Sequence, residues 1–406
     1  AASHAGEEAV RCATPPAASA GMAAVHLINN DAVYVTSVAF QYQAAVAVSS
    51  VEPRTGVLGG GTLVRVLGRG FAPSATTLVR VGSQPAVVAR VLSSALLECV
   101  TPSRTEPGLL SVEVTLNEQD FSSDEVLFEY QAAARVWGVS PAKGPSGGGG
   151  LVNVTGSGFS QRSYVLSYMF ARFNRTRVPV VWVSSSEVHC VAPEHASGVV
   201  RVELTLNDQQ YTGDAVSFEY QDVVAHSVEP RSGPVLGGTL VVVRGANFHA
   251  PGSLGLFCKF VGVDVVAASH EGEEAVRCAT PAAASAGLVS VHLINNDAVY
   301  ATSVVFQYDT QILVKAIFPE VGPISGASLI HVHGASFPLS HFSICRFTLH
   351  SPGGVAIVVP AAVSSPYRLS CVLPTLPVAG TFNLELSFNG QDFSSDEIFF
   401  QATVPA

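Results

Sequence analysis

The stretch SVEVTLNEQDFSSDEVLFEYQ, residues 111–131, decides the fold of this chain. Its first part, Ser111 to Asn117, alternates apolar and polar side chains with a period of two, which is the pattern of a half-buried β-strand. The polar residues 117–120 end that run, and a second run returns to Phe128-Glu129-Tyr130. An asparagine-led turn between two such runs predicts a β-hairpin.

The end of this hairpin recurs along the chain at a nearly constant period. The spacings between successive copies are 88, 90, 88 and 94 residues, and the other copies are Phe40-Gln41-Tyr42, Phe218-Glu219-Tyr220, Phe306-Gln307-Tyr308 and the degraded Phe400-Gln401-Ala402. A Cys-x-x-Pro element precedes each copy and begins at Cys12, Cys99, Cys190, Cys278 and Cys371. Complete units also open on a proline and a glycine-rich turn, such as Gly59-Gly60-Gly61-Thr62. A repeat of this kind indicates tandem domains.

Each complete unit reads as an all-β sandwich. It holds about seven short strands with turns every 8 to 12 residues, which is typical of two packed antiparallel sheets. The predicted units are 44–131, 132–221, 222–309 and a divergent 310–406, and residues 1–43 form only the rear half of a unit. Linkers between the units are almost absent, so we expect a stiff linear rod.

The combined pattern of Pro, Gly-Gly-Thr, Gly-x-x-Phe, Cys-x-x-Pro, Asn-x-Gln-Asp-Phe and Phe-x-Tyr resembles the IPT/TIG family, the immunoglobulin-like domain of plexins and certain transcription factors. The resemblance covers nearly the whole chain. It implies early-set immunoglobulin sandwiches, commonly found in tandem on extracellular proteins, and it implies no catalytic residues and no cofactor.

Residues 1–43 match residues 267–309 at 35 of 43 positions. Half a sandwich exposes a core face and open strand edges, so we expect this segment to be unstable by itself. Its front strands would come either from residues upstream of this sequence or from another chain.

Composition excludes several classes of partner. Charged residues make up only 13% of the chain, the net charge is −10, and no run of lysine or arginine could follow a phosphate backbone. Nucleic acid is therefore not an expected partner. Every apolar stretch is interrupted within about ten residues, which is too short for a membrane span in this segment.

The seven cysteines predict two disulfides, because two units carry a second cysteine at an equivalent position: Cys258 with Cys278, and Cys345 with Cys371. Each should stabilise its unit by about 3 kcal/mol and favours an oxidising compartment. In the first two complete units, Val79 and Ala171 occupy the positions at which a partner cysteine would stand, so we expect Cys99 and Cys190 to be buried free thiols. Cys12 would pair with a residue upstream of Ala1. Zinc is disfavoured because no Cys-x-x-Cys pattern is present.

Other polar motifs suggest sites of modification or binding. Asn153-Val154-Thr155 and Asn174-Arg175-Thr176 fit the acceptor pattern for N-linked glycans. Two acidic clusters in the final hairpins could offer oxygen ligands to Ca²⁺, but solvated turn carboxylates are the simpler interpretation: Asp120, Asp124 and Glu125, and Asp392, Asp396 and Glu397. No arrangement of nucleophile, base and orienting group marks an enzyme.

These observations favour a non-enzymatic structural subunit of an extracellular fibre or cell-surface appendage, built from copies of itself. The alternative is an adhesin or plexin-like receptor ectodomain whose repeats act as a stalk for ligand binding. Both predict an extracellular or cell-surface location. The transcription-factor branch of the family is disfavoured by the acidic charge, and an accessory domain of a carbohydrate-active enzyme is a further alternative.

Overall fold

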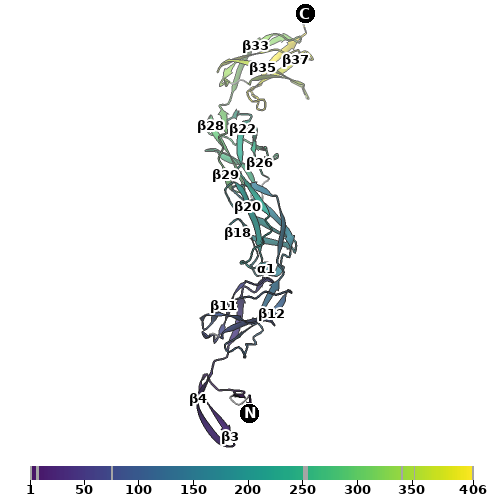
Figure 1. The fold of residues 1–406 in the computed structure, drawn as a ribbon. Helices are drawn as coiled ribbons and strands as arrows, with labels where there is room; N and C mark the ends of the chain where they lie inside the picture. The colour runs from purple at the N-terminus through teal and green to yellow at the C-terminus, as the bar shows by residue number, and fades with distance from the viewer. Residues whose placement is uncertain are drawn as a thin grey trace.

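A computed structural model describes residues 2–5, 9–74, 76–249, 255–339, 342–351 and 353–404. The chain forms an elongated column in which β-sandwiches follow one another from the N-terminus to the C-terminus (Figure 1). Within the described residues, the one helix is the short α1 (Gln161–Val165). The predicted class, all-β with tandem immunoglobulin-like sandwiches, is confirmed.

The first complete repeat contains two packed sheets. One has the strand order β10-β11-β7-β5 and the other has the order β6-β13-β12-β8-β9. The strands are β5 (Ala47–Glu52), β6 (Thr55–Val57), β7 (Leu63–Arg69), β8 (Leu78–Val81), β9 (Val87–Val88), β10 (Arg90–Ser93), β11 (Leu96–Val100), β12 (Gly108–Thr115) and β13 (Leu127–Gln131).

The second repeat keeps this plan, except that one long strand joins the two sheets. Strand β18 pairs with β17 in one sheet and with β19 in the other. The strands are β14 (Arg135–Ser140), β15 (Lys143–Pro145), β16 (Leu151–Ser157), β17 (Phe170–Phe173), β18 (Thr176–Ser184), β19 (Glu187–Val191), β20 (Gly198–Thr205) and β21 (Ser217–Gln221).

The third and fourth repeats each contain a similar long strand that pairs with both sheets. This strand is β26 in the third repeat and β35 in the fourth. The third contains β22 (Val224–Glu229), β23 (Ser232–Pro234), β24 (Leu240–Ala246), β25 (Leu256–Phe260), β26 (Asp264–His270), β27 (Ala275–Ala279), β28 (Gly287–Asn295), β29 (Ala298–Tyr300) and β30 (Val305–Asp309). The fourth contains β31 (Leu313–Phe318), β32 (Val321–Pro323), β33 (Leu329–Ala335), β34 (Ile344–Leu349), β35 (Ala356–Ser365), β36 (Arg368–Val372), β37 (Gly380–Ser387) and β38 (Ile398–Thr403).

Each repeat has a core of its own, built by the inward side chains of alternating strands. Phe128 and Tyr130 are both fully buried, with ring centroids 5.1 Å apart in an edge-to-face arrangement. The Tyr130 hydroxyl donates to the carbonyl oxygen of Pro102 at 2.9 Å. The two sequence anchors, Phe-x-Tyr and Cys-x-x-Pro, are therefore held together in the fold.

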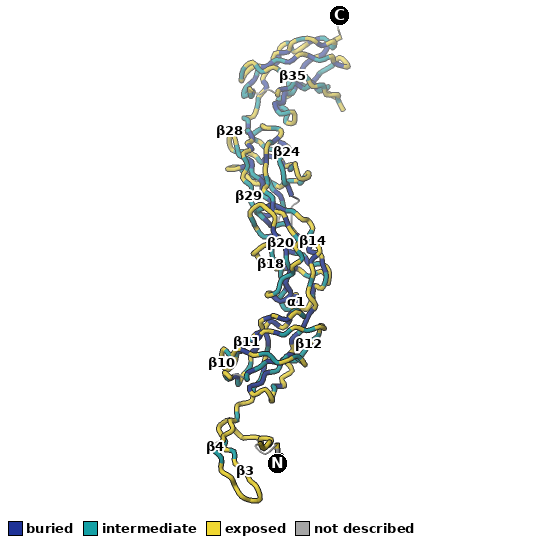
Figure 2. The backbone as a smooth tube through the Cα atoms, viewed as in Figure 1, coloured by how far each residue is buried: buried dark blue, intermediate teal, exposed yellow. Residues whose placement is uncertain are grey.

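In the segment 1–43, the described residues form two separate two-stranded sheets and no sandwich. They are β1 (Ala2–His4) with β2 (Val10–Cys12), and β3 (Gly21–Asn29) with β4 (Ala32–Tyr42). The described side chains of this segment are mostly exposed, in contrast to the buried interiors of the four repeats (Figure 2).

Candidate functional site: the joints between repeats

A four-residue turn follows the long rear strand in three of the repeats, at residues 117–120, 207–210 and 389–392. We call these segments the docking turns. Each begins with an asparagine whose side-chain oxygen accepts backbone N–H bonds from within the turn. For Asn389, the donors are Gln391 at 3.0 Å and Asp392 at 2.9 Å. An asparagine can close a turn in this way because its side chain mimics a backbone carbonyl.

The turn of one repeat lies against the glycine-rich segment of the preceding repeat. We call this segment, residues 59–63, 147–151, 236–240 and 325–329, the glycine edge. Successive repeats are therefore linked by a recurring contact as well as by the covalent chain. We name the three contacts between complete repeats the first, second and third joints, counted from the N-terminus.

The first joint is a set of hydrogen bonds. Asn207 is buried, and its side-chain amide donates to the hydroxyl of Thr62 at 3.2 Å. The Gln209 side chain pairs with both backbone groups of Leu63, each at 2.8 Å. Gln210 donates to the carbonyl of Gly61 at 3.0 Å. Two-point pairing between an amide side chain and a backbone fixes the orientation of the two repeats.

The connection between the first and second repeats adds a second set of contacts to this joint. Gln131 donates to the hydroxyl of Ser160 at 2.9 Å and accepts from the buried hydroxyl of Ser163 at 2.9 Å. Arg162, on helix α1, forms an ion pair with Glu129 at 2.9 Å. The short helix therefore anchors the second repeat to the last strand of the first.

The third joint repeats the scheme of the first with different atoms. Asp392 accepts from the Thr239 hydroxyl at 2.7 Å, and Gln391 donates to the carbonyl of Leu240 at 3.0 Å. Asn389 donates to the carbonyl of Ser232 at 3.0 Å. Thr239 is the counterpart of Thr62, and each threonine is fully buried at its joint.

The second joint uses close packing instead. The third repeat has no four-residue turn here, because β28 and β29 form a tight hairpin through Asn296 and Asp297, both with positive φ. The Tyr300 hydroxyl accepts from the N–H of Gly147 at 3.0 Å. A Cβ added to Gly147 would lie 2.2 Å from the Cβ of Ala298, and one added to Gly149 would lie 2.3 Å from that of Asn296. Both glycines are therefore needed for the hairpin to dock.

Charged groups also meet at the second joint. Lys143 forms an exposed ion pair with Glu273 at 2.9 Å, and this partner lowers the pKa of Glu273. Nearby, burial and then the positive charge of Lys143 lower the pKa of His249, whose Nε2 is buried without a hydrogen-bond partner. Burial raises the pKa of Tyr300, so its hydroxyl stays protonated at the joint.

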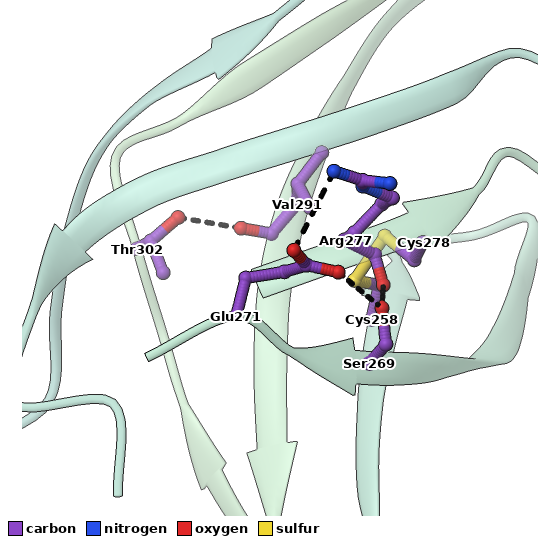
Figure 3. Close-up of a disulfide and its surroundings, with 7 residues drawn as sticks. All are labelled: Cys258, Ser269, Glu271, Arg277, Cys278, Val291 and Thr302. Atoms are coloured by element: carbon purple, nitrogen blue, oxygen red, sulfur yellow. Dashed lines mark hydrogen bonds and ion pairs between the residues drawn. A yellow bond between two sulfur atoms is a disulfide. The ribbon is translucent and has the colours of Figure 1, made fainter. Parts of the chain in front are cut away.

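The two predicted cysteine pairs are joined in the structure. Cys258 is bonded to Cys278, and Cys345 to Cys371, with a Cα–Cα distance of 6.4 Å in each pair. Figure 3 shows the first bond close to the Arg277–Glu271 ion pair, which spans 3.5 Å. Each bond connects a strand of one sheet to a strand of the other, so it cross-links the two sheets within one repeat.

The remaining cysteines are free. Cys99 and Cys190 are buried, as expected, and burial raises the pKa of each thiol to about 12. These thiols are protonated at neutral pH and are not set up as nucleophiles. Cys12 is exposed and unpaired.

The acidic clusters have structural roles that the sequence did not reveal. Asp124 accepts from the backbone N–H of Val48 at 2.7 Å, and Asp396 accepts from that of Val314 at 2.8 Å. These carboxylates fasten the rear of a repeat to its first strand, and Asp392 serves a joint. In the described ranges, no group of three or more His, Cys, Asp or Glu side chains could hold a metal ion.

The two glycosylation motifs lie on the surface of the second repeat. Asn153 is half-buried in β16 with its side chain on the outer face, between the buried Val152 and Val154. Asn174 is exposed in the turn between β17 and β18. In the part of the chain that the structure describes, no helix has the length and apolar character needed to cross a bilayer.

A family model described as the IPT/TIG domain matches residues 47–130, 135–220, 224–308 and 313–402. The chain belongs to the IPT/TIG domain family. The expected resemblance is thus confirmed, and the docking turns and glycine edges are features of IPT/TIG repeats in this chain.

The relatives of these IPT/TIG repeats are large proteins. The chain is 26% identical to human "Fibrocystin-L" over 298 residues, which cover 71% of this chain and 7% of that protein. It is 27% identical to human "Plexin-B3" over 242 residues, which cover 58% of this chain and 12% of that protein. A structure of the full extracellular region of plexin A4 aligns with a TM-score of 0.46 and 14% identity, covering 88% of this chain and 38% of that one.

Proposed function

We propose that this IPT/TIG array is a non-enzymatic stalk in the ectodomain of a receptor or adhesin, where it holds a recognition element at a fixed distance and orientation. The observation that carries the proposal is the series of three joints. Each joint fixes one sandwich against the next through a recurrent turn or hairpin on a glycine edge. A flexible tether would not need buried polar groups such as Asn207 at its joints.

Two further observations support an extracellular or cell-surface setting. Two disulfides inside sandwiches are favoured in an oxidising compartment. The relatives include several plexins, the receptor class that the repeat pattern resembles. Because the chain spans only 7% of fibrocystin-L and 12% of plexin-B3, recognition of a ligand would reside elsewhere in a protein of that size.

The fibre-subunit hypothesis has weaker support. It requires lateral or end-to-end contacts between copies, and its main argument is the charge-poor surface, with 13% charged residues. The same surface suits a stalk that carries glycans. We propose glycans at Asn153 and Asn174, where a half-buried and an exposed asparagine lie on the outside of the second repeat.

Electron microscopy of the purified chain over a range of concentrations separates the two functions. A stalk gives isolated rods of uniform length at every concentration, whereas a fibre subunit gives filaments with an axial repeat of a few domain lengths. Filaments would overturn the stalk proposal.

Secretion from a eukaryotic host tests the glycans in the same material. The intact mass should fall after enzymatic deglycosylation, and each of the Asn153→Gln and Asn174→Gln variants should remove part of that mass difference. An unchanged mass in the wild-type chain would contradict the glycan proposal.

A further inference from the structure

Each of the four repeats has a β-bulge in its first strand, and the extra residue of the bulge is exposed. Strand register identifies this residue as Trp137 in the second repeat, and as Ser49, His226 and Lys315 in the first, third and fourth. Three of these side chains are polar, as expected for a solvated position. Trp137 differs, because it is 68% exposed and presents a large apolar ring to the solvent.

The residue after the bulge also differs in the second repeat. It is Gly138 there, and Ser50, Ser227 and Ala316 in the first, third and fourth repeats. Neither backbone conformation nor packing requires this glycine, because its φ is not positive and an added Cβ would meet only the Thr155 hydroxyl, at an ordinary contact distance of 3.8 Å. The glycine instead leaves the backbone uncovered beside the indole ring, so a flat group can approach the sheet closely at this point.

The glycan acceptor motif lies on the neighbouring strand of the same sheet, next to these two residues. Strand register pairs Gly138 with Thr155 and Ser140 with Asn153, and the Thr155 hydroxyl donates to the carbonyl oxygen of Gly138 at 3.3 Å. The usual spacing within and between strands puts the Cα atoms of Asn153 and Trp137 about 10 Å apart. The first sugars of a glycan on Asn153 therefore reach the space above Gly138 and the exposed ring of Trp137.

The first repeat has an ion pair at the positions where the second repeat has the acceptor asparagine and its cross-strand neighbour. Arg65 is the counterpart of Asn153, and it pairs with Glu98 on the adjacent strand at 3.1 Å. In the second repeat the residue opposite Asn153 is His189, whose side chain is hydrogen-bonded along its own strand to Glu187 at 2.9 Å. The second repeat thus lacks the ion pair that covers this part of the sheet in the first repeat, and it has an attachment point for a polar glycan there.

We propose that the outer sheet of the second repeat binds the chain's own glycan: the N-acetylglucosamine residues attached to Asn153 stack on Trp137 and lie over Gly138. This inference rests on the glycan proposed above at Asn153. One face of a pyranose ring consists of C–H groups, and these contact the electron-rich face of an indole favourably. Because the sugar is tethered beside the ring, its effective concentration is high, and it occupies the surface ahead of carbohydrate from any other molecule. The glycan is thereby held in one orientation on the stalk.

Tryptophan fluorescence of the chain secreted from a eukaryotic host tests whether the sugar covers the ring. The chain has two tryptophans, and the other one, Trp182, is half-buried with its indole N–H bonded to the carbonyl oxygen of Phe159 at 3.0 Å. Quenching by acrylamide therefore reports mainly on Trp137. Asn153→Gln should raise the quenching constant about two-fold, because the sugar covers one of the two faces of the ring. The matched control Asn174→Gln removes the other acceptor and should leave quenching at the wild-type value.

The rate at which a peptide N-glycosidase releases the glycan from the native protein gives a second readout. Trp137→Ala should speed release at Asn153 several-fold, whereas Val181→Ala, an exposed position on the other side of Asn153 in the same sheet, should not. Release at Asn174 should be equal in all these proteins, which shows that the second repeat remains folded.

The mass of the peptide that contains Asn153 separates the two ways in which the inference fails. If this peptide carries sugar but Asn153→Gln leaves quenching unchanged, or Trp137→Ala leaves release unchanged, the stacking is overturned and the glycan proposal stands. If the peptide carries no sugar in the wild-type chain, the glycan proposal at Asn153 is overturned together with the inference that rests on it.

Discussion

The first and second joints place equivalent glycine edges against the following repeat, but the two contacts differ in chemistry. At the first joint, side-chain amides of a four-residue turn form hydrogen bonds with Thr62 and with the backbone of Leu63 in the glycine edge. At the second joint a hairpin enters, and the glycine edge makes room for it with Gly147 and Gly149. The length of the loop therefore selects between a hydrogen-bonded joint and a close-packed one.

The difference between the joints is also visible in the residue type at one equivalent position of the glycine edge. The residue that is Thr62 in the first repeat is Thr239 in the third, and each precedes a repeat with a four-residue turn. The same position is Gly150 in the second repeat, which precedes the repeat with the hairpin. At this position, a threonine hydroxyl forms a hydrogen bond across the joint when the next repeat places a polar side chain beside it.

The largest effect on stability is expected from removing the asparagine of the docking turn 207–210, which contacts the glycine edge of the first repeat. Asn207→Ala loses the buried bond to Thr62 and removes the acceptor of the Gln209 and Gln210 N–H groups, so it should lower the local unfolding free energy at the first joint by about 2 to 3 kcal/mol. The matched variant is Asn117→Ala, whose turn is exposed, where the loss should be about 1 kcal/mol. Hydrogen exchange of peptides that cover each turn measures both values. Equal losses would mean that the contact across the joint contributes nothing.

A smaller effect is expected from filling the space that the hairpin occupies. Gly147→Ala forces two Cβ atoms apart and should weaken the second joint by about 2 kcal/mol, read from exchange in β28 and β29. Gly59 is the equivalent position at the first joint, and a Cβ there meets nothing within 4 Å. Gly59→Ala should leave its joint unchanged, and a similar loss in both variants would remove the distinction drawn between them.

Acid should weaken the second joint and spare the first. The pKa of His249 is lowered by burial and by Lys143, so the unfolded chain binds a proton more readily than the folded one. The contribution is fully present above the ordinary value of 6.5 and is lost as the pH falls below it. Glu273, His270 and Glu219 also act on this ring, and His249→Gln tests which group is responsible. The protection factors of amides at the second joint, which are corrected for the pH dependence of intrinsic exchange, should fall between pH 7 and pH 5 in the wild type only. The same fall in the variant would assign it to another group.

The smallest effect is expected from the exposed ion pair. Lys143→Gln removes the partner of Glu273 at the second joint, but both side chains are open to solvent, so the change should be slight and should vanish in concentrated salt. Thermal unfolding at low and high ionic strength measures it. A large loss that persists in salt would show that Lys143 contributes through packing instead.

Sequence reasoning predicted the sandwiches, the disulfide pairs and the buried thiols because these depend on local periodicity and on equivalent positions. It interpreted the glycine-rich segments that open the units only as turns, and Gly147 to Gly150 is one of these segments. The role of this turn in a joint was missed because its contact partners lie about 150 residues away in the sequence. Gly147 and Leu63 also form their hydrogen bonds through backbone groups, which almost every residue type has, so the sequence at these positions does not indicate the contact. One feature of the sequence could have indicated the joints. Thr62 and Thr239 each precede a repeat with a four-residue turn, whereas Gly150, at the same position, precedes the repeat with the hairpin.

The acidic residues of the hairpins were misjudged for a related reason. Asp124 and Asp396 were read as solvated carboxylates, yet each binds a backbone N–H more than 70 residues away in the same repeat. Their counterpart in the second repeat, Asp214, does the same with Val136 at 2.8 Å. The third repeat has the longer hairpin in this region and no aspartate at the matching place.

The three joints should hold the four repeats as one continuous rod. Small-angle X-ray scattering of the wild-type chain tests this rigidity most directly, because the distribution of interatomic distances reports the whole shape in solution. We expect a single extended distribution that matches the structure in Figure 1 and does not change with concentration. A compact distribution, or one that only an ensemble of bent repeats can fit, would contradict it.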